Sequence, residues 1–173
     1  MFRLDMEGDV VKDEIRDISV EEIPECVKVI RTAFKTVADE FGFTEENAPR
    51  FTAFATDEDR IKYQFAVEHR PMYVYLLNGR IVGYYSLAVL ENDEIELNNL
   101  SVLPEVRHMG IGQMLLEDCM ERARIMGMKK LKFGIVDENV RLRKWYEKFE
   151  FVHTDSVKYD FFPFTCGYME QEL

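Results

Sequence analysis

Two apolar strand patterns joined by Asn78-Gly79 constrain the fold of this chain more than any other feature. The segments "MYVYLL" (72–77) and "RIVGYYSLAVL" (80–90) flank this dipeptide, which is the strongest short signal for a tight β-hairpin. A second turn, "ENDE", leads into a further strand pattern, "IELNNLSV" (95–102). Three consecutive antiparallel strands are therefore predicted for the middle of the chain.

A helix and a fourth strand pattern follow these three strands. Apolar residues from Ile111 to Met126 recur at helical spacing, and Gly127 is suited to end that helix. The segment 129–136 then reads as a strand. Because parallel strands need a long crossover connection, the strand at 95–102 and the strand at 129–136 are predicted to be neighbours on either side of a crossover helix.

The remaining segments complete a mixed α/β pattern. Ser19 and Glu22 form a capping-box signal before a helix that Pro24 places near its first turn. The other predictions are a strand at 13–18, a helix entered at Thr56 and running through 57–69 until Pro71, a helix at 139–149, and strands at 151–162 and 164–173. We therefore expect one domain, 1–173, with a mixed, mostly antiparallel central sheet flanked by helices.

Composition narrows the function classes. The 173 residues carry a formal net charge of −11, which argues against binding to nucleic-acid phosphates and favours cationic small molecules. Cys26, Cys119 and Cys166 are widely spaced and form no CxxC pair, as expected for reduced thiols in a cytosolic protein. The three histidines are equally scattered, so no metal site is predicted.

The sequence contains no feature of a targeted or membrane-bound chain. The first ten residues, "MFRLDMEGDV", lack the apolar region of a signal peptide. The apolar runs elsewhere are too short to span a bilayer. We expect a cytoplasmic protein without a membrane partner.

The segment 39–71 is rich in aromatic residues, with two possible explanations. They could form a small core against the sheet, which we favour, or a wall that faces a ligand. The residues concerned are Phe41, Phe43, Phe51, Phe54, Tyr63 and Phe65.

The segment "PEVRHMGIGQML" (104–115) predicts an anion-binding site. Gly110 and Gly112 lie at the beginning of the predicted crossover helix, where glycine has a cost in stability. A helix N-terminus presents unpaired N–H groups and a partial positive charge, and glycines let an anion approach them closely. Arg107 adds a guanidinium that could bind a phosphate through two parallel hydrogen bonds.

The segment "LSVLPEVRHMGIGQMLLEDCMERARIMG", followed by "DENVRLRKWYEKFEF", resembles the acetyl-CoA-binding core of the GNAT superfamily of acyl-CoA-dependent N-acetyltransferases. The detailed match covers Glu96 to Val152, about a third of the chain. The resemblance implies the GNAT fold and direct transfer of an acetyl group from acetyl-CoA to an amine. It departs at Glu150, where family members commonly have glycine; Glu150 must adopt a positive φ, or the helix must end differently.

The resemblance also implies which residues bind the cofactor. The coenzyme A arm would pair with the backbone of Leu100, Ser101 and Val102, and a backbone N–H there would polarise the thioester carbonyl. Asn139 would hydrogen-bond the arm, or alternatively cap a helix. The pyrophosphate would bind at Arg107, His108, Met109, Gly110, Ile111 and Gly112, with the amide of Gln113.

The two catalytic roles follow from the same resemblance. Glu96 matches the strand carboxylate that many members use as a general base, directly or through water, and Glu94 lies on the same face as a reserve candidate. Tyr146 matches the tyrosine that protonates the leaving thiolate. The alternatives are that Glu96 is an ordinary strand residue and that Tyr146 packs in the core beside Trp145.

Three other functions compete with an acetyltransferase that acts on a small amine. A dinucleotide-binding enzyme is disfavoured because Leu115 stands where the third small residue of its glycine motif belongs. A non-catalytic acyl-CoA sensor on the same fold, or an enzyme that acetylates a protein or peptide amine, stays open. A homodimer is expected because two-fold dimers are the commonest oligomers.

Overall fold

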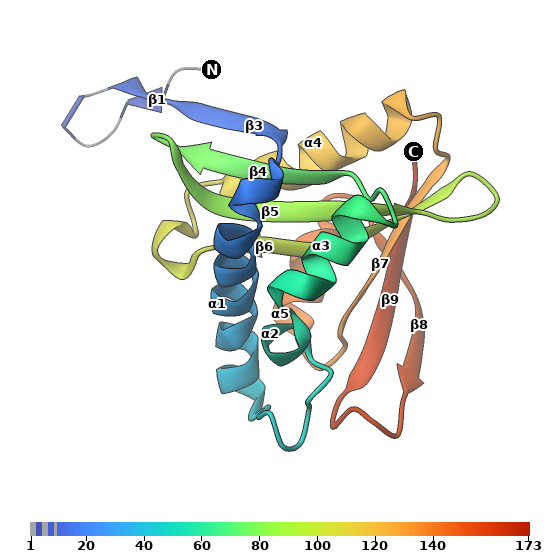
Figure 1. Cartoon of the computed structure of the whole chain (residues 1–173). Helices are drawn as coiled ribbons and strands as arrows, with labels where there is room; N and C mark the ends of the chain where they lie inside the picture. Colours follow the sequence, from blue (N-terminus) through green and yellow to red (C-terminus); the bar gives the residue numbers. More distant parts are fainter. Residues whose placement is uncertain (1–2, 5–6, 9) are drawn as a thin grey trace.

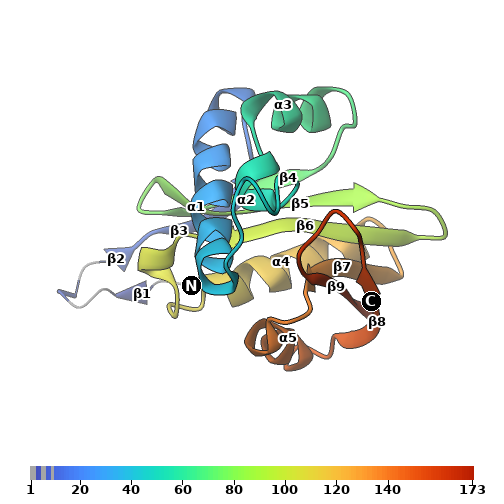
Figure 2. The same ribbon diagram turned by 90° about the horizontal axis from the view of Figure 1, so that it is seen from below.

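A seven-stranded sheet with helices on both faces forms the centre of the computed structural model, which describes residues 3–4, 7–8 and 10–173 (Figure 1). The strand order is β3-β4-β5-β6-β7-β9-β8. Figure 2 shows α1, α2 and α3 on one face of the sheet and α4 and α5 on the other. The strands of this sheet are β3 (Asp13–Asp17), β4 (Met72–Leu77), β5 (Arg80–Val89), β6 (Glu94–Val102), β7 (Lys130–Val136), β8 (Val152–Lys158) and β9 (Thr165–Glu172).

The helices and the remaining short elements complete the chain. The strands β1 (Arg3–Leu4) and β2 (Val10–Val11) pair with each other in a separate small sheet. The helices are α1 (Ile23–Phe41), α2 (Thr52–Ala55), α3 (Glu58–Ala66), α4 (Ile111–Ile125) and α5 (Val140–Glu147), with single 3₁₀ turns at Val20–Glu22 and Pro104–Val106. None of the helices in the described residues is long and apolar enough to cross a membrane.

The predicted hairpin is confirmed. β4 and β5 are antiparallel, and Asn78 and Gly79 both have positive φ, 52° and 79°, as a tight turn of this kind requires. β5 also pairs antiparallel with β6. Asn99 has a φ of 55° and coincides with a register shift between these two strands, so β6 contains a bulge that the sequence analysis did not predict.

The predicted parallel pair is β6 and β7, connected by α4. The two strands pair at three positions, of which Glu96–Lys132 is the last along both strands. Beyond this pair, β6 continues beside β5, whereas β7 continues beside β9. The sheet therefore splits between β6 and β7, and we call this opening the fork.

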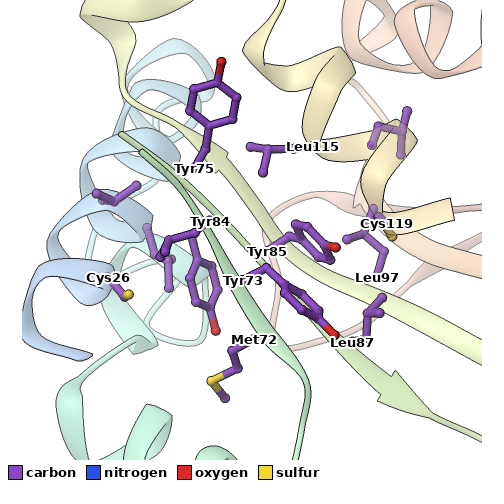
Figure 3. Close-up of a cluster of buried hydrophobic side chains, with 14 of the residues drawn as sticks. Cys26, Met72, Tyr73, Tyr75, Tyr84, Tyr85, Leu87, Leu97, Leu115 and Cys119 are labelled. Carbon is purple, nitrogen blue, oxygen red and sulfur yellow. The ribbon is translucent and has the colours of Figure 1, made fainter. Parts of the chain in front are cut away.

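The main core lies on both faces of the central strands, and tyrosines fill much of it (Figure 3). Tyr84 and Tyr85 are adjacent in β5 and fully buried, so they face opposite layers. The Tyr85 hydroxyl donates to Asp118 of α4 at 2.6 Å, and Arg122 donates to the same carboxylate at 2.8 Å. The bond from Tyr85 fixes α4 to the sheet and thereby positions its N-terminus, and Arg122 holds the Asp118 carboxylate from within the helix.

Aromatic residues of the segment 39–71 form a second, smaller core, as favoured above. Phe43 and Phe51 are buried, with ring centroids 5.1 Å apart, and both contact the ring of Phe164. Because Phe164 lies just before β9, this core attaches the connection after α1 to the β8–β9 hairpin. Two of the six residues lie elsewhere: Phe65 packs against the main core, and Tyr63 is 56% exposed on α3.

The prediction for the helix at 57–69 needs two corrections. The helix α3 begins after Asp57, whose carboxylate accepts the amide of Arg60 at 2.8 Å, so Asp57 and not Thr56 is its N-cap. It ends at Ala66, before Pro71, because His69 already has a left-handed backbone with φ 52°. The single turn of α2 was not predicted.

Candidate functional site

The fork leaves one edge of β6 without a neighbouring strand in the described chain. The residues of β6 after Glu96 pair with β5 on one side, while β7 has turned away on the other. The three predicted arm-binding residues, Leu100, Ser101 and Val102, lie on this stretch. An extended polar chain could therefore bind here through backbone hydrogen bonds, as an added strand does.

The N-terminus of α4 lies just beyond this edge and is open. Gly110 is its N-cap, with a left-handed φ of 81° and no side-chain cap. The backbone hydrogen bonds of this helix begin at Met114, whose amide donates to the Gly110 carbonyl at 3.0 Å. The preceding amides of Ile111, Gly112 and Gln113 are free of intrahelical partners, as at any helix start. They form a row suited to an anion.

The side chains of this segment leave that row uncovered. His108 has a positive φ of 63° and is exposed, and Met109 is 38% exposed. The side-chain amide of Gln113 donates to the Glu117 carboxylate at 2.8 Å, one turn further along α4. These neighbours of Gly110 therefore contribute backbone geometry, and any direct contact from their side chains to a ligand stays a prediction.

Arg107 is bound to the protein itself. Its guanidinium donates to the Val102 carbonyl at 3.1 Å, to the Thr36 hydroxyl at 3.0 Å and to the Ala33 carbonyl at 3.0 Å. Burial lowers its pKa. Arg107 thus joins the end of β6 to α1 and holds the glycine segment in place, and its contact with a phosphate stays a prediction.

The helix α5 lies across the opening of the fork from α4. Asn139 is its N-cap, because its Oδ1 accepts the Leu142 amide at 3.2 Å. The indole of Trp145 lies 3.6 Å from the point where a Cβ on Gly112 would stand. After the helix, Glu150 adopts the positive φ of 68° that was one of the two expectations for it.

Tyr146 lies in the core between α5 and β7. It is 6% exposed, and its ring centroid lies 4.3 Å from that of Phe133 on β7. Burial, with a smaller contribution from Cys119, raises the pKa of its phenol above the ordinary value of 10. No hydrogen bond joins its hydroxyl to another described side chain, so this proton donor remains unused beside the fork.

A cavity of about 450 Å³ opens at the base of the fork, and Glu96 and Lys132 form part of its wall. Strands on both sides of the fork contribute to it: the other lining residues are Leu90, Phe133, Thr154, Asp155, Tyr168, Met169 and Glu170. The carboxylates of Glu96 and Asp155 have no cationic partner among the described side chains. The cavity is therefore acidic, which suits a cationic ligand.

The carboxylate of Glu94 already has two lysine partners. Its carboxylate accepts a hydrogen bond from Lys132 and lies 3.7 Å from Lys130. The hydrogen bond from Lys132 lowers the pKa of Glu94. Because a base with a lowered pKa takes up a proton less readily, Glu96 is the better candidate of the two.

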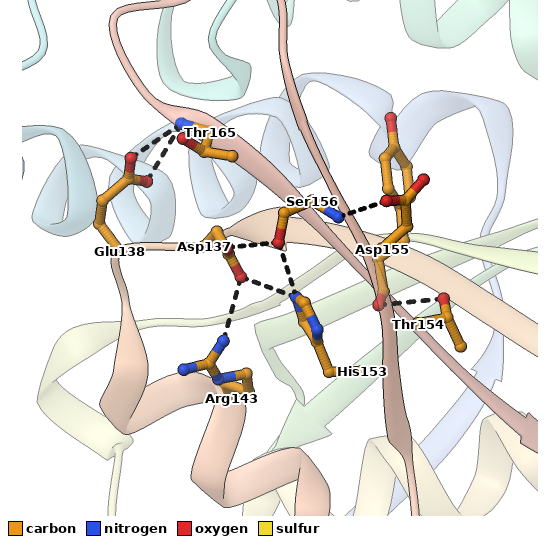
Figure 4. Close-up of polar contacts among 9 residues, drawn as sticks. Asp137, Glu138, Arg143, His153, Thr154, Asp155, Ser156 and Thr165 are labelled. Carbon is orange, nitrogen blue, oxygen red and sulfur yellow. Dashed lines mark hydrogen bonds and ion pairs between the residues drawn. The ribbon is translucent and has the colours of Figure 1, made fainter.

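Asp137, directly after β7, is the centre of a polar cluster that connects three elements (Figure 4). Its carboxylate accepts Ser156 at 2.7 Å and Arg143 at 3.3 Å, and it lies 2.9 Å from Nε2 of His153. Ser156 also approaches that same Nε2 at 3.2 Å. A hydrolytic triad needs the serine and the carboxylate on different ring nitrogens, so this cluster is an anchor for α5 and β8.

The residues of β8 and β9 that line the cavity were not predicted from the sequence. Asp155 and Tyr168 face each other across this strand pair, and Tyr168 alternates with Glu170 along β9. The alternation was a usable signal, but their position beside Glu96 depends on the strand order, which the sequence does not contain. Among the described residues, no group of three His, Cys, Asp or Glu could hold a metal ion.

Comparison with known proteins agrees with this geometry. Residues 35–151 match the model of the "Acetyltransferase (GNAT) family". An uncharacterized N-acetyltransferase, YjgM of Escherichia coli, is 27% identical over 147 residues, which cover 82% of this chain and 83% of that protein.

Solved structures share the fold. The PaiA N-acetyltransferase of Thermoplasma acidophilum, in complex with coenzyme A, superimposes with a TM-score of 0.79 at 18% identity and covers 94% of this chain and 99% of its own. The ribosomal-protein-S18-alanine N-acetyltransferase of Escherichia coli gives 0.71 at 17% identity, covering 93% and 94%. YncA, a putative acetyltransferase of Salmonella typhimurium with acetyl-CoA, gives 0.70 at 19% identity, again covering 93% and 94%.

Proposed function

Because this chain belongs to the acetyltransferase (GNAT) family, we propose that it transfers an acetyl group from acetyl-CoA to the primary amine of a small cationic molecule. Glu96 is the base and Tyr146 the acid in this proposal. The observation that carries it is the position of Glu96, which is the last β6 residue paired with β7 before the fork opens and also lines an acidic cavity.

The residues around the fork fit acetyl-CoA as the donor. The free amides of Ile111, Gly112 and Gln113 offer hydrogen bonds to its pyrophosphate. No atom lies within 4 Å of where a Cβ on Gly110 would stand, so an anion has room there. From Val102 to Glu96 the open edge of β6 extends for about 20 Å, which lets the arm of the donor reach the cavity.

The acidic cavity supports a cationic acceptor. An ammonium ion would be attracted by Glu96 and Asp155, the two carboxylates there without a cationic partner in the described chain. Before it can react, the amine must lose a proton, which Glu96 takes directly or through water in this proposal. The amine nitrogen then forms a bond to the acetyl carbon, while the carbon–sulfur bond breaks.

Tyr146 supplies the proton that the departing sulfur needs. Its raised pKa keeps the phenol protonated over the physiological range, and its hydroxyl is not used by another described residue. Two protons leave the nitrogen: Glu96 takes the first from the ammonium, and the second is lost to solvent once the nitrogen has bonded to the acetyl carbon. Tyr146 delivers one proton to the thiolate, so each turnover releases one proton overall. Solvent restores both groups between turnovers.

The test is a thiol-release assay with acetyl-CoA and a panel of cationic, neutral and anionic amines. We expect turnover with cationic amines. Glu96→Gln and Tyr146→Phe should each lower it by about 10- to 10,000-fold, the range of acid–base groups, with coenzyme A affinity unchanged. Tyr84→Phe is the matched control, because this buried tyrosine faces α1 and should keep normal turnover.

Each other outcome identifies an alternative. Coenzyme A binding without thiol release from any amine or peptide would indicate an acyl-CoA sensor. Release that occurs with peptide amines alone would indicate a protein or peptide acceptor. Normal turnover of Tyr146→Phe would remove Tyr146 from the reaction.

A further inference from the structure

A pair of hydrogen-bonded tyrosines lies beside the cavity and has no role in the chemistry above. The hydroxyl of Tyr168 on β9 lies 2.8 Å from the hydroxyl of Tyr159, which directly follows β8. The ring of Tyr159 stacks on Phe161 with centroids 5.2 Å apart. The stacking on Phe161 therefore restrains the Tyr159 ring, and the hydrogen bond between the two hydroxyls restrains Tyr168.

The ring of Tyr168 is directed toward the fork by a glycine. In the β7–β9 ladder Tyr168 is opposite Gly134. A Cβ on Gly134 would lie 3.6 Å from Cε1 of Tyr168, so the ring lies over this position of β7. Gly134 comes two residues after Lys132, the last β7 residue paired with β6. The ring therefore lies just inside the fork, in the wall of the cavity that contains Glu96.

The charges around Tyr168 and the chemistry of its ring both favour a bound cation. Tyr168 also lies opposite Asp155 in the β8–β9 ladder, so its ring has a carboxylate of the cavity on either side. Burial, and then the hydrogen bond to Tyr159, raise its pKa, and the nearby charge of Glu96 acts in the same direction. Tyr168 is consequently a neutral phenol among carboxylates, and the face of such a ring attracts a cation.

We propose that Tyr168 is the positioning residue of the acceptor site, where its ring, held by Tyr159, receives the acceptor ammonium between Asp155 and Glu96. The proposal rests on the proposed function and adds the residue that selects a charged amine over a neutral one. When the Tyr168 hydroxyl donates to Tyr159, its oxygen also accepts a hydrogen bond from the amine.

The experiment measures amine binding without turnover. 1,4-Diaminobutane and aniline, which is neutral at neutral pH, are titrated by calorimetry into the protein saturated with coenzyme A. We expect Tyr168→Leu to raise the Kd of the diamine about tenfold and to change the Kd of aniline much less. Tyr159→Phe should raise the Kd of the diamine about threefold, because it removes the hydrogen bond that holds the ring. Tyr168→Phe should raise it further, because it also removes the oxygen that accepts from the amine.

Tyr63→Leu is the control, since Tyr63 is exposed on α3, and it should bind both amines like the wild type. Thermal unfolding and coenzyme A affinity verify that each variant is folded. A wild-type protein that does not bind the diamine, an unchanged diamine Kd in Tyr168→Leu, or an equal change for both amines would overturn the proposal. Binding that depends on Tyr168 without thiol release would instead contradict the proposed function alone.

Discussion

The N-termini of α4 and α5 lie on the same side of the sheet, but they are completed in opposite ways. At α4, Gly110 provides no side chain and the first amides stay open. At α5, Asn139 caps the helix with its own oxygen, and Asp137, two residues earlier, is bound by β8 and α5. The first terminus is therefore open, as the proposed binding of a pyrophosphate requires, and the second is fixed to its neighbours within the helix that carries Tyr146.

The largest effect that tests this contrast is expected from Gly110→Val. Valine strongly disfavours the left-handed φ of 81° at this position, so the amide row should lose its orientation. We expect coenzyme A to bind about 100-fold more weakly by calorimetry, equivalent to two lost hydrogen bonds to a charged group.

Gly127→Val is the matched control for that variant. Gly127 has nearly the same φ, 78°, at the other end of the same helix, and a Cβ there would also meet no atom within 4 Å. Both substitutions should lower the melting temperature, but Gly127→Val should bind coenzyme A normally. Equal affinity in the two variants would mean that the start of α4 does not bind the pyrophosphate.

A smaller effect is expected from Asp137→Asn. We expect the free energy of unfolding at neutral pH to fall by about 2 kcal/mol, because a half-buried carboxylate with several hydrogen bonds is lost. Burial opposes ionisation of Asp137, but the hydrogen bonds from Ser156 and His153 lower its pKa below the ordinary 3.8. Its stabilising contribution is therefore complete above pH 3.8 and disappears as the pH falls further.

Denaturant unfolding of the Asp137 variant at several pH values measures both effects. The wild type should lose more stability than Asp137→Asn as the pH is lowered below 3.8. Asp160→Asn, which replaces an exposed carboxylate, should follow the wild type. If both variants show the wild-type pH dependence, the cluster does not stabilise the start of α5.

The smallest effect is expected at Asn139. Asn139→Ala should lower the free energy of unfolding by about 1 kcal/mol, as the loss of a helix cap does. Asn139→Asp keeps a capping oxygen and should restore that stability. If the Asn139 side-chain amide also binds the donor, both variants will bind coenzyme A a few-fold more weakly; normal binding of the Asp variant would leave Asn139 as a cap alone.

Features encoded within a few neighbouring residues could be predicted. The Asn78-Gly79 turn, the capping box of Ser19 with Glu22, and the left-handed end of α4 at Gly127 are all in place. The resemblance to the GNAT superfamily is confirmed by the family match. This resemblance depended on two motifs that follow one another along the chain, so the sequence alone was enough to detect it.

Features that depend on residues far apart in the chain could not be predicted. Arg107 reads as a phosphate ligand from its neighbours, but its guanidinium contacts α1 at Ala33 and Thr36, about seventy positions earlier. Tyr168 enters the cavity because strand order places it over Gly134. The bulge at Asn99 is intermediate in predictability, because asparagine is uncommon in strands and tolerates positive φ, which is a local signal.

The fork also divides the molecule by chain position. The open edge and the start of α4 come from residues 94–113, whereas β7, β9 and β8 all come from 130–172. A chimera that crosses between two relatives at the turn after α4 would combine the open edge of β6 and the start of α4 from one parent with β7, α5, β8 and β9 from the other. Exchange of this C-terminal segment should alter which amine is acetylated, while the same acyl-CoA donor is used.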